Sequence, residues 1–186
     1  MKKKTLIQLC APVLLAAFMP FAHAFDMRPD ALTVQGGGGD ERVRMLGAGL
    51  RWDWDFERLR KAAELTAHTE FLVNQWRSQR ADRSGDAQYT QLVLLPTLRM
   101  QLARGASPWF LEFGIGVSWL DHKFETPGHT FSTAWNFYDV LGAGYVIGGP
   151  TGRDEIQLRL GHFSNAGLEN PNPGETFLQL RYARRF

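Results

Sequence analysis

The feature that most constrains this chain is a two-residue alternation of apolar and polar side chains. Between Trp109 and Trp119 every second residue is apolar, and the residues between them are mostly glycine, serine or glutamate. Between Leu92 and Leu102 a similar apolar series alternates with a face that carries Thr, Arg and Gln. Successive side chains of a β-strand point to opposite faces, whereas a helix would spread these residues around its circumference. The pattern therefore predicts strands with one apolar face and one small or polar face.

The same alternation recurs along the chain, separated by runs rich in Gly, Pro, Asn and Ser. Further alternating segments are residues 45–54, 63–74 and 156–164. Runs typical of turns are residues 36–40, 83–86, 104–107, 148–152 and 170–174. These turns divide the chain into about eight strands of roughly 9–11 residues, the length that a tilted membrane strand needs.

A sheet whose apolar face meets lipid must close on itself, because every main-chain N–H and C=O then needs a partner within the protein. The expected fold is an all-β, eight-stranded antiparallel transmembrane β-barrel of the outer-membrane type, the smallest common closure. Aromatic residues near strand ends, where interfacial girdles occur, are Trp52, Trp54, Trp109, Trp119, Trp135 and Tyr182. The alternative is a soluble, lipocalin-like barrel, which would leave the glycine-rich face in water.

The N-terminus has the pattern of an export signal. Lysines at positions 2–4 precede an apolar run, residues 13–19, and the small-residue site Ala22-His23-Ala24. We expect a signal peptide over residues 1–24 and a single β-barrel domain over residues 25–186. Removing three of the 21 basic residues leaves 18 against 19 acidic residues. The near-neutral mature chain lacks the basic excess of a nucleic-acid-binding protein.

Histidines, hydroxyls and carboxylates are the candidates for chemistry, because Cys10, the single cysteine, lies in the predicted signal peptide. His68 alternates with Glu64, Thr66 and Glu70, which predicts a place in a polar lumen. His122 and His129 lie in a predicted loop, where solvated histidines are usual. Nothing in the spacing indicates a metal site, and nothing suggests a cofactor.

His162 and Ser164 occupy an unusual face. The apolar series Ile156, Leu158, Leu160 continues directly into His162 and Ser164, so both polar side chains should point outward. An unpaired imidazole or hydroxyl facing hydrocarbon is costly. Residues two apart lie about 7 Å apart along a strand. The pair therefore has the arrangement of a nucleophile with its base, unless the strand leaves the membrane at Leu160 and both groups meet headgroups or water.

The segment His162-Phe163-Ser164-Asn165-Ala166-Gly167-Leu168, followed by Asn170-Pro171-Asn172-Pro173-Gly174, resembles the lipid A 3-O-deacylases of Gram-negative outer membranes. Weaker resemblances are Trp52-Asp53-Trp54-Asp55, residues 112–117 and residues 136–144. The resemblance implies an eight-stranded barrel that hydrolyses the ester of the 3-hydroxyacyl chain at position 3 of lipid A. It implies His162 as general base, Ser164 as nucleophile, and Asn165 with the main-chain N–H of Gly167 as oxyanion donors.

The residue that orients the histidine is where this chain departs from the family. Family members have a Glu at the start of the last strand, and the nearest candidate is Glu175. A gapless alignment instead puts Thr176 there, and Thr176 shares the outward face of Leu178 while Glu175 should point inward. Asp139 is a rival, because hairpin geometry puts it almost opposite His162. Glu175, Asp139 or neither therefore remain open.

Three functions compete. The first is an outer-membrane esterase that removes the 3-O-linked acyl chain of lipid A, so that lipopolysaccharide would be its substrate. The second is a structural or adhesive small barrel, although the predicted loops are short for an adhesin. The third is another lipid A-modifying barrel, such as an acyltransferase. The sequence leaves the oligomeric state open between a monomer and a homodimer.

Overall fold

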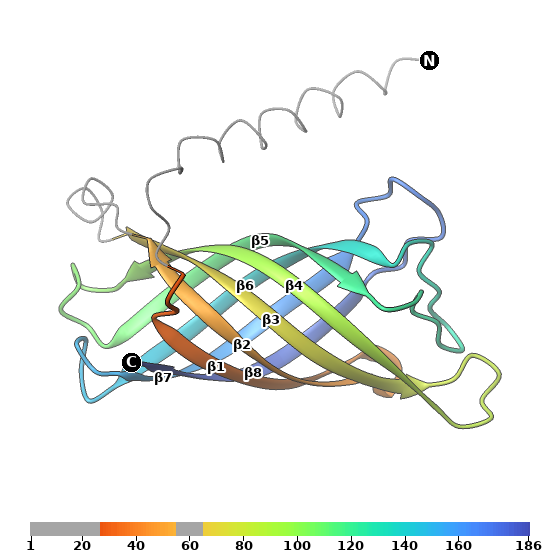
Figure 1. The fold of residues 1–186 in the computed structure, drawn as a ribbon, viewed down its shortest axis with the longest axis horizontal. Helices are drawn as coiled ribbons and strands as arrows, with labels where there is room; N and C mark the ends of the chain where they lie inside the picture. Colours follow the sequence, from red (N-terminus) through yellow and green to blue (C-terminus); the bar gives the residue numbers. More distant parts are fainter. Residues whose placement is uncertain (1–26, 55–64) are drawn as a thin grey trace, which may run out of the picture.

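A computed structural model describes residues 27–54 and 65–186. Its strands are β1 (Ala31–Gly39), β2 (Arg44–Trp54), β3 (Leu65–Gln79), β4 (Asp86–Gln101), β5 (Trp109–Leu120), β6 (Trp135–Ile147), β7 (Asp154–Ser164) and β8 (Glu175–Arg185), with a short 3₁₀ helix, η1 (Asp40–Arg42), after β1. Each strand pairs with the next, and β1 pairs antiparallel with β8 (Figure 1), so that the sheet is a closed eight-stranded barrel. The expected fold is confirmed.

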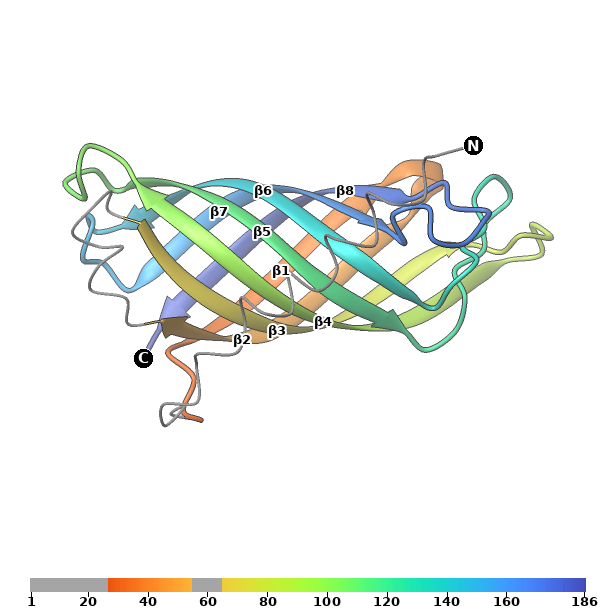
Figure 2. The ribbon, with the colours of Figure 1, turned by 90° about the horizontal axis from the view of Figure 1, so that it is seen from above.

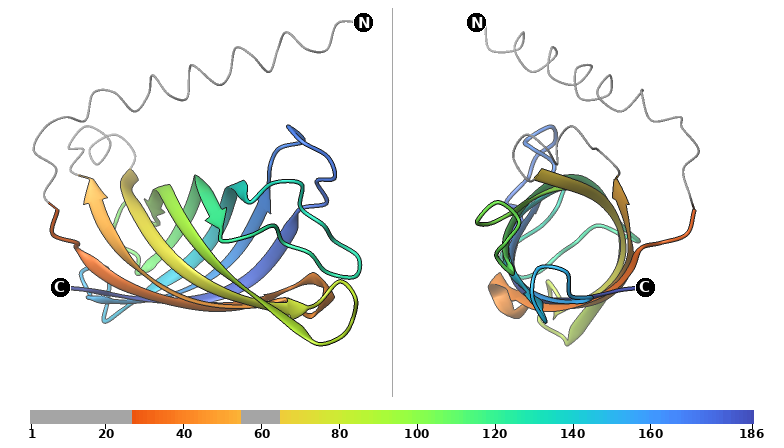
Figure 3. Two further views of the ribbon diagram at one scale, coloured as in Figure 1. Left: turned by 45° about the vertical axis from the view of Figure 1, so that its right-hand side comes forward. Right: turned by 90° about the vertical axis from the view of Figure 1, so that its left-hand side faces the viewer.

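The alternation in the sequence becomes an outer and an inner face. In β5, Trp109, Phe113 and Ile115 are exposed, while Phe110 and Glu112 between them are buried. Viewed along its axis, the barrel is a ring of strands (Figure 3). The buried side chains of the inner face lie inside this ring. The apolar outer face is the surface that a barrel presents to lipid.

The two ends of the barrel differ. The connections 121–134 and 165–174 are long and lie at the same end as the β1–β2 and β3–β4 turns, whereas the C-terminus lies at the opposite end (Figures 1 and 2). Outer-membrane barrels have their longer loops outside the cell, so we call the long-loop end the outer end. Within residues 27–54 and 65–186, no helix is long and apolar enough to cross a membrane. The predicted signal peptide, residues 1–24, lies outside the described residues.

The glycines at positions 36–39 were expected to form a turn and instead end β1. Gly37 faces the interior, where an added Cβ would overlap the main-chain oxygen of Leu178 and lie 3.0 Å from Cγ of Gln179. Gly37 and Gly39 are therefore needed because β8 packs closely against them. The chain reverses one step later, at η1.

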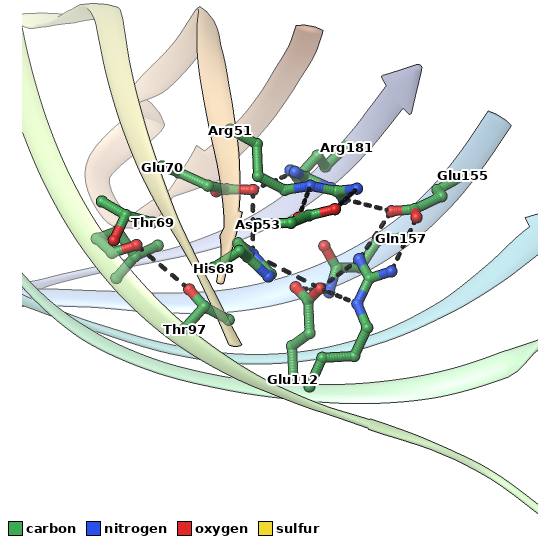
Figure 4. A network of polar contacts seen from close by, with 12 residues as sticks. Arg51, Asp53, His68, Thr69, Glu70, Thr97, Glu112, Glu155, Gln157 and Arg181 are labelled. Atoms are coloured by element: carbon green, nitrogen blue, oxygen red, sulfur yellow. Dashed lines mark hydrogen bonds and ion pairs between the residues drawn. The ribbon is translucent and has the colours of Figure 1, made fainter. Parts of the chain in front are cut away.

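In the half of the barrel interior that is farther from the outer end, buried charged side chains form ion pairs (Figure 4). The Arg159 guanidinium donates to Glu70 at 2.7 Å and to Glu112 at 2.9 Å. Arg99 donates to Glu112 at 2.7 Å and to Glu155 at 2.8 Å. Arg51 and Arg181 extend the network through Glu155 and Glu70. Because these side chains come from six strands, β2, β3, β4, β5, β7 and β8, the network links the barrel wall across its interior.

The outer half of the interior is aromatic instead. Trp76 contacts Phe163 and Phe177 edge-on or tilted, with ring centroids 5.1 and 4.7 Å away. The 121–134 connection adds Phe124 and Phe131, which are 0% and 1% exposed. This loop therefore folds into the mouth of the barrel and closes it with side chains.

We expect Glu70→Ala to destabilise the barrel by roughly 3–5 kcal/mol, because it leaves Arg159 and Arg181 buried with fewer charge partners. The measurement is the urea midpoint of unfolding in lipid vesicles, followed by tryptophan fluorescence. Asp154→Asn, which removes an exposed partner of Arg184, is the control and should leave the midpoint in place. Equal midpoints for both variants would contradict a structural role for the network.

Candidate functional site

Three polar residues form a row across the outer face of β6, β7 and β8. In the strand register, His162 lies opposite Asp139 on one side and opposite Thr176 on the other. All three are half-buried and share their faces with exposed leucines such as Leu141, Leu160 and Leu178. A polar row within an apolar wall is costly unless its members serve one another or a ligand.

His162 is held from both sides of its ring. Its Nδ1 lies 2.9 Å from Oγ1 of Thr176, within hydrogen-bond distance. Gly174, at φ +72°, approaches the other edge, where an added Cβ would lie 2.6 Å from Cε1 and 3.0 Å from Nε2. The Thr176 contact occupies Nδ1, and Nε2 lies toward Gly174, the residue before β8.

Ser164 ends β7 two residues after His162 and shares its outward face. In the register it lies opposite Phe137 of β6. Within the described part of the chain, no hydrogen bond joins the Ser164 hydroxyl to His162. Hydrogen bonds between catalytic groups are often long without substrate and shorten in the complex. The hydroxyl therefore lies on the same face of β7 as the imidazole, two residues nearer the outer end.

Glu175 points away from this row, into the barrel. Its side chain is 0% exposed, accepts a hydrogen bond from the main-chain N–H of Asp40 at 2.8 Å, and lies 3.2 Å from Nδ1 of His129. The inward direction expected from strand parity is what the structure shows. No bulge brings the carboxylate to the outer face, so Glu175 lies on the wrong side of the barrel wall to contact His162. Its contact with His129 instead anchors the 121–134 loop.

Asp139 lies opposite His162, as hairpin geometry predicted. Laterally paired residues of a sheet have their Cβ atoms about 5 Å apart. Within residues 27–54 and 65–186, no hydrogen bond or ion pair joins Asp139 to His162. The carboxylate is therefore a neighbour of the imidazole and not its direct hydrogen-bond partner.

The two predicted oxyanion donors are used within the 165–174 loop. The Asn165 side chain donates to Ser132 Oγ at 2.8 Å and to the main-chain oxygen of Glu169 at 3.0 Å. Its Oδ1 accepts from the main-chain N–H of Gly167 at 3.0 Å, and its own main-chain N–H donates to Asn172. In this structure Asn165 fixes the loop and joins it to the 121–134 connection.

The other histidines take structural positions. His68 is buried near Glu70 and Glu112, as expected for a lumen residue. His122 stacks on Tyr89 with centroids 4.4 Å apart, and His129 contacts Glu175. Among the residues that the structure describes, no group of three or more His, Cys, Asp or Glu side chains could hold a metal ion.

Comparison with known proteins decides the family. The family model of the lipid A 3-O-deacylase (PagL) matches residues 46–185, which include the whole polar row. The chain belongs to the lipid A 3-O-deacylase family.

Two curated relatives of this deacylase family carry the name lipid A deacylase PagL. The protein of Pseudomonas aeruginosa is 28% identical over 137 residues, which cover 72% of this chain and 73% of the relative. That of Bordetella bronchiseptica is 35% identical over 78 residues, a match that spans 42% of each chain. The crystal structure of the outer membrane enzyme PagL has a TM-score of 0.68 and 25% identity, and the match covers 84% of this chain and 99% of that one. The chain is therefore an outer-membrane barrel of the deacylase family.

Two residues near the site were not singled out from the sequence as functional. Gly174 was recognised as a turn residue, but its packing on His162 depends on the register of β8. Ser132, which accepts from Asn165, lies 33 positions away in another loop. No local pattern relates such partners, because the barrel alone brings the two loops together.

We expect Gly174→Ala to lower lipid A deacylation by about a hundredfold, because an added Cβ would displace the imidazole of His162. Release of 3-hydroxy fatty acid from lipid A measures the effect. Gly105→Ala is the matched control, since Gly105 has a similar φ of +78° but open space around it, at the opposite end of the barrel. Similar losses in both variants would show that backbone strain, and not displacement of His162, is responsible.

Proposed function

We propose that this protein hydrolyses the ester of the 3-hydroxyacyl chain at position 3 of lipid A, with Ser164 as nucleophile and His162 as base, on the lipid-facing wall of the barrel. The observation that carries the proposal is the polar row of Asp139, His162 and Thr176 beside Ser164, set within an otherwise apolar outer face. Family membership supports the substrate class.

In the proposed reaction, Nε2 of His162 removes the proton of Ser164 as Oγ attacks the ester carbonyl carbon. The tetrahedral intermediate collapses by breaking the bond to the sugar oxygen, which takes the proton from the imidazolium. Water, deprotonated by His162, then attacks the carbonyl carbon of the acyl-serine. The bond from that carbon to Oγ of Ser164 breaks, Oγ takes the proton back from the imidazolium, and the 3-hydroxy fatty acid is released. Each step moves one proton between the imidazole and an oxygen, and no atom changes its oxidation state.

Thr176 is the positioning residue in this proposal. With Nδ1–H donated to Oγ1 of Thr176, the imidazole has its lone pair on Nε2, the tautomer that a base needs. The 2.9 Å separation of Nδ1 and Oγ1 supports this assignment. Glu175, one of the two candidates from the sequence, contacts Asp40 and His129 on the inner side of the wall, and Asp139 is the other.

Asn165 and Gly167 as oxyanion donors stay a prediction. Their N–H groups would have to exchange their present acceptors in the loop for the substrate oxygen during the reaction. Asn165 also links the loop after Ser164 to Ser132, so its replacement is expected to change the position of the nucleophile as well.

A site on the outer wall suits a substrate dissolved in the outer leaflet. Lipid A can reach Ser164 by lateral diffusion, with its acyl chains remaining beside exposed side chains such as Leu158, Leu160 and Leu178. The substrate then does not have to leave the membrane. An adhesive barrel would have no comparable use for a serine and histidine in this position, whereas an acyltransferase could use the same pair with an alcohol in place of water as the acyl acceptor.

We expect Ser164→Ala and His162→Asn each to reduce release of 3-hydroxy fatty acid by at least a thousandfold, because each removes a group that acts in the chemical step. Mass spectrometry of lipid A from an expressing Gram-negative host gives the readout, and heat-modifiable migration verifies folding. Full activity in Ser164→Ala would reject the mechanism. A gain of acyl mass with the parent protein would indicate an acyltransferase, and unchanged lipid A a structural barrel.

The role of Thr176 has a separate test. Thr176→Val removes the hydrogen bond to Nδ1 and is expected to lower kcat by about a hundredfold, whereas Thr176→Ser should retain most activity. Thr176→Glu should shift the acid limb of the pH profile to higher pH, because a carboxylate stabilises the imidazolium. Thr90→Val, on the outer face of β4, is the control. Normal kcat and an unchanged pH profile in Thr176→Val, with a collapse in Asp139→Asn, would assign the role to Asp139.

A further inference from the structure

Ser164 lies where the strand pairing of β7 ends. It is the last residue of β7 that pairs with β6, while the pairing with β8 ends one residue earlier, at Phe163 opposite Glu175. The main-chain N–H of the next residue, Asn165, donates to the side chain of Asn172 at 3.0 Å. The position of the Ser164 side chain therefore depends on side-chain contacts of the loop as well as on the sheet.

Asn165 carries most of these contacts, and its main acceptor lies in the neighbouring loop. Asn165 is 1% exposed, and its amide nitrogen donates to Oγ of Ser132 at 2.8 Å. Oγ1 of Thr133 lies 3.4 Å from the same nitrogen. The main-chain N–H of Ser132 donates to the carbonyl oxygen of Pro171 at 3.1 Å. Because a buried amide donor needs an acceptor, Ser132 holds the 165–174 loop at two points.

Three residues before Ser132, the same loop is held by a buried carboxylate. One oxygen of Glu175 lies 3.2 Å from Nδ1 of His129, and the other accepts the main-chain N–H of Asp40 at 2.8 Å. Gly39 makes room for this side chain, since an added Cβ there would overlap Oε1 of Glu175. A buried carboxylate is costly unless its partners satisfy it. Here its two partners lie in two different connections at the outer end.

The segment from His129 to Ser132 links these two sets of contacts. Phe131, which lies between them, is 1% exposed, and its ring packs against Phe124 with centroids 5.1 Å apart. The segment is therefore held at its first residue by Glu175, next to its end by aromatic packing, and at its end by the hydrogen bonds of Ser132. A displacement at Glu175 would be passed along this short segment toward the nucleophile.

We propose that Ser132 is a positioning residue of the reaction, which holds Asn165 and so directs the Ser164 hydroxyl toward its base. Glu175 keeps Ser132 in place through its contact with the loop. Glu175 then acts on the nucleophile from inside the barrel, the side of the wall from which it cannot contact the catalytic imidazole. The assignment of Ser164 as nucleophile rests on the proposed function, whereas the path of contacts rests on the distances given above.

Steady-state release of 3-hydroxy fatty acid from lipid A is the first test. We expect Ser132→Ala to lower kcat about tenfold and to leave KM unchanged, because Ser132 acts on the orientation of a reacting group. Ser132→Thr keeps a hydroxyl acceptor and should retain most activity. Thr130→Ala, which removes an exposed hydroxyl from the same loop, is the matched control. A parent-like kcat in Ser132→Ala, or an equal loss in Thr130→Ala, would overturn the proposal.

A double-mutant cycle tests whether Ser132 acts through Asn165. In the Asn165→Ala background Ser132 has no amide to hold, so Ser132→Ala should cause no further loss of kcat. Losses that multiply in the double variant would show that the two residues act independently, which contradicts the proposed path.

The inner end of the path has its own cycle. His129→Ala removes the contact with Glu175 and is expected to lower kcat about fourfold, with heat-modifiable migration confirming the fold. In that background Glu175→Gln should add little. A large loss in Glu175→Gln that persists in the His129→Ala background would mean that the carboxylate acts on His162 by another route, against the proposal.

Alkylation of a thiol at position 164 tests the geometry without lipid A. In Ser164→Cys the mature protein carries one thiol, because Cys10 lies in the predicted signal peptide. A neighbouring imidazole favours the thiolate and so accelerates its reaction with iodoacetamide. The rate in Ser164→Cys divided by the rate in Ser164→Cys with His162→Asn measures this pairing and cancels the exposure of the thiol.

We expect this ratio to be about ten and to fall toward one when Ser132→Ala is added. A ratio that Ser132→Ala leaves unchanged would overturn the positioning role, even if the parent protein deacylates lipid A. If the parent releases no fatty acid, the proposed function fails, whereas the alkylation ratio still decides whether Ser132 positions residue 164 relative to His162.

Discussion

Closure of the sheet on itself is the constraint on which the rest of the structure depends. Because each strand is bonded on both sides, and β1 on β8, the register of every strand is fixed by two neighbours. A slip of one residue would turn its lipid-facing side chains into the lumen. The direction of each side chain therefore follows from its parity in the strand. Strand parity alone therefore places the His162 side chain on the outer face and the Phe163 side chain in the interior.

The interior makes this wall rigid enough to carry a site on its outer surface. Buried ion pairs of Arg99 and Arg159 join strands that are distant around the ring, and Phe124 and Phe131 fill the outer mouth. An interior packed with side chains leaves little space for a substrate, so chemistry on a small barrel is expected at its surface. The polar row of Asp139, His162 and Thr176 is such a surface feature.

Much of this arrangement could be predicted from the sequence, because it depends on period and parity alone. The eight strands, the outward direction of His162 and Ser164, and the position of Asp139 opposite His162 all follow from these two properties. The contacts of Glu175 could not be predicted in this way, because its partners His129 and Asp40 lie in connections whose paths leave no periodic signal in the sequence. The same holds for Asn165. The glycines at 36–39 resembled a turn because composition does not distinguish a tight bend from tight packing.

In the family, one glutamate at the start of the last strand would orient the histidine. In this chain, the adjacent residues Glu175 and Thr176 of β8 point to opposite faces of the sheet. Glu175 keeps the carboxylate but applies it inside, to His129, while Thr176 supplies a neutral oxygen to His162 outside. A hydroxyl can fix the tautomer of the imidazole, yet it stabilises the imidazolium less than a carboxylate does. Asp139, on the opposite side of His162, can supply that charge without a hydrogen bond, since Coulomb interactions over about 5 Å remain strong beside hydrocarbon. In this chain, Thr176 of β8 would then orient the imidazole of His162, and Asp139 of β6 would stabilise the positive charge of the imidazolium.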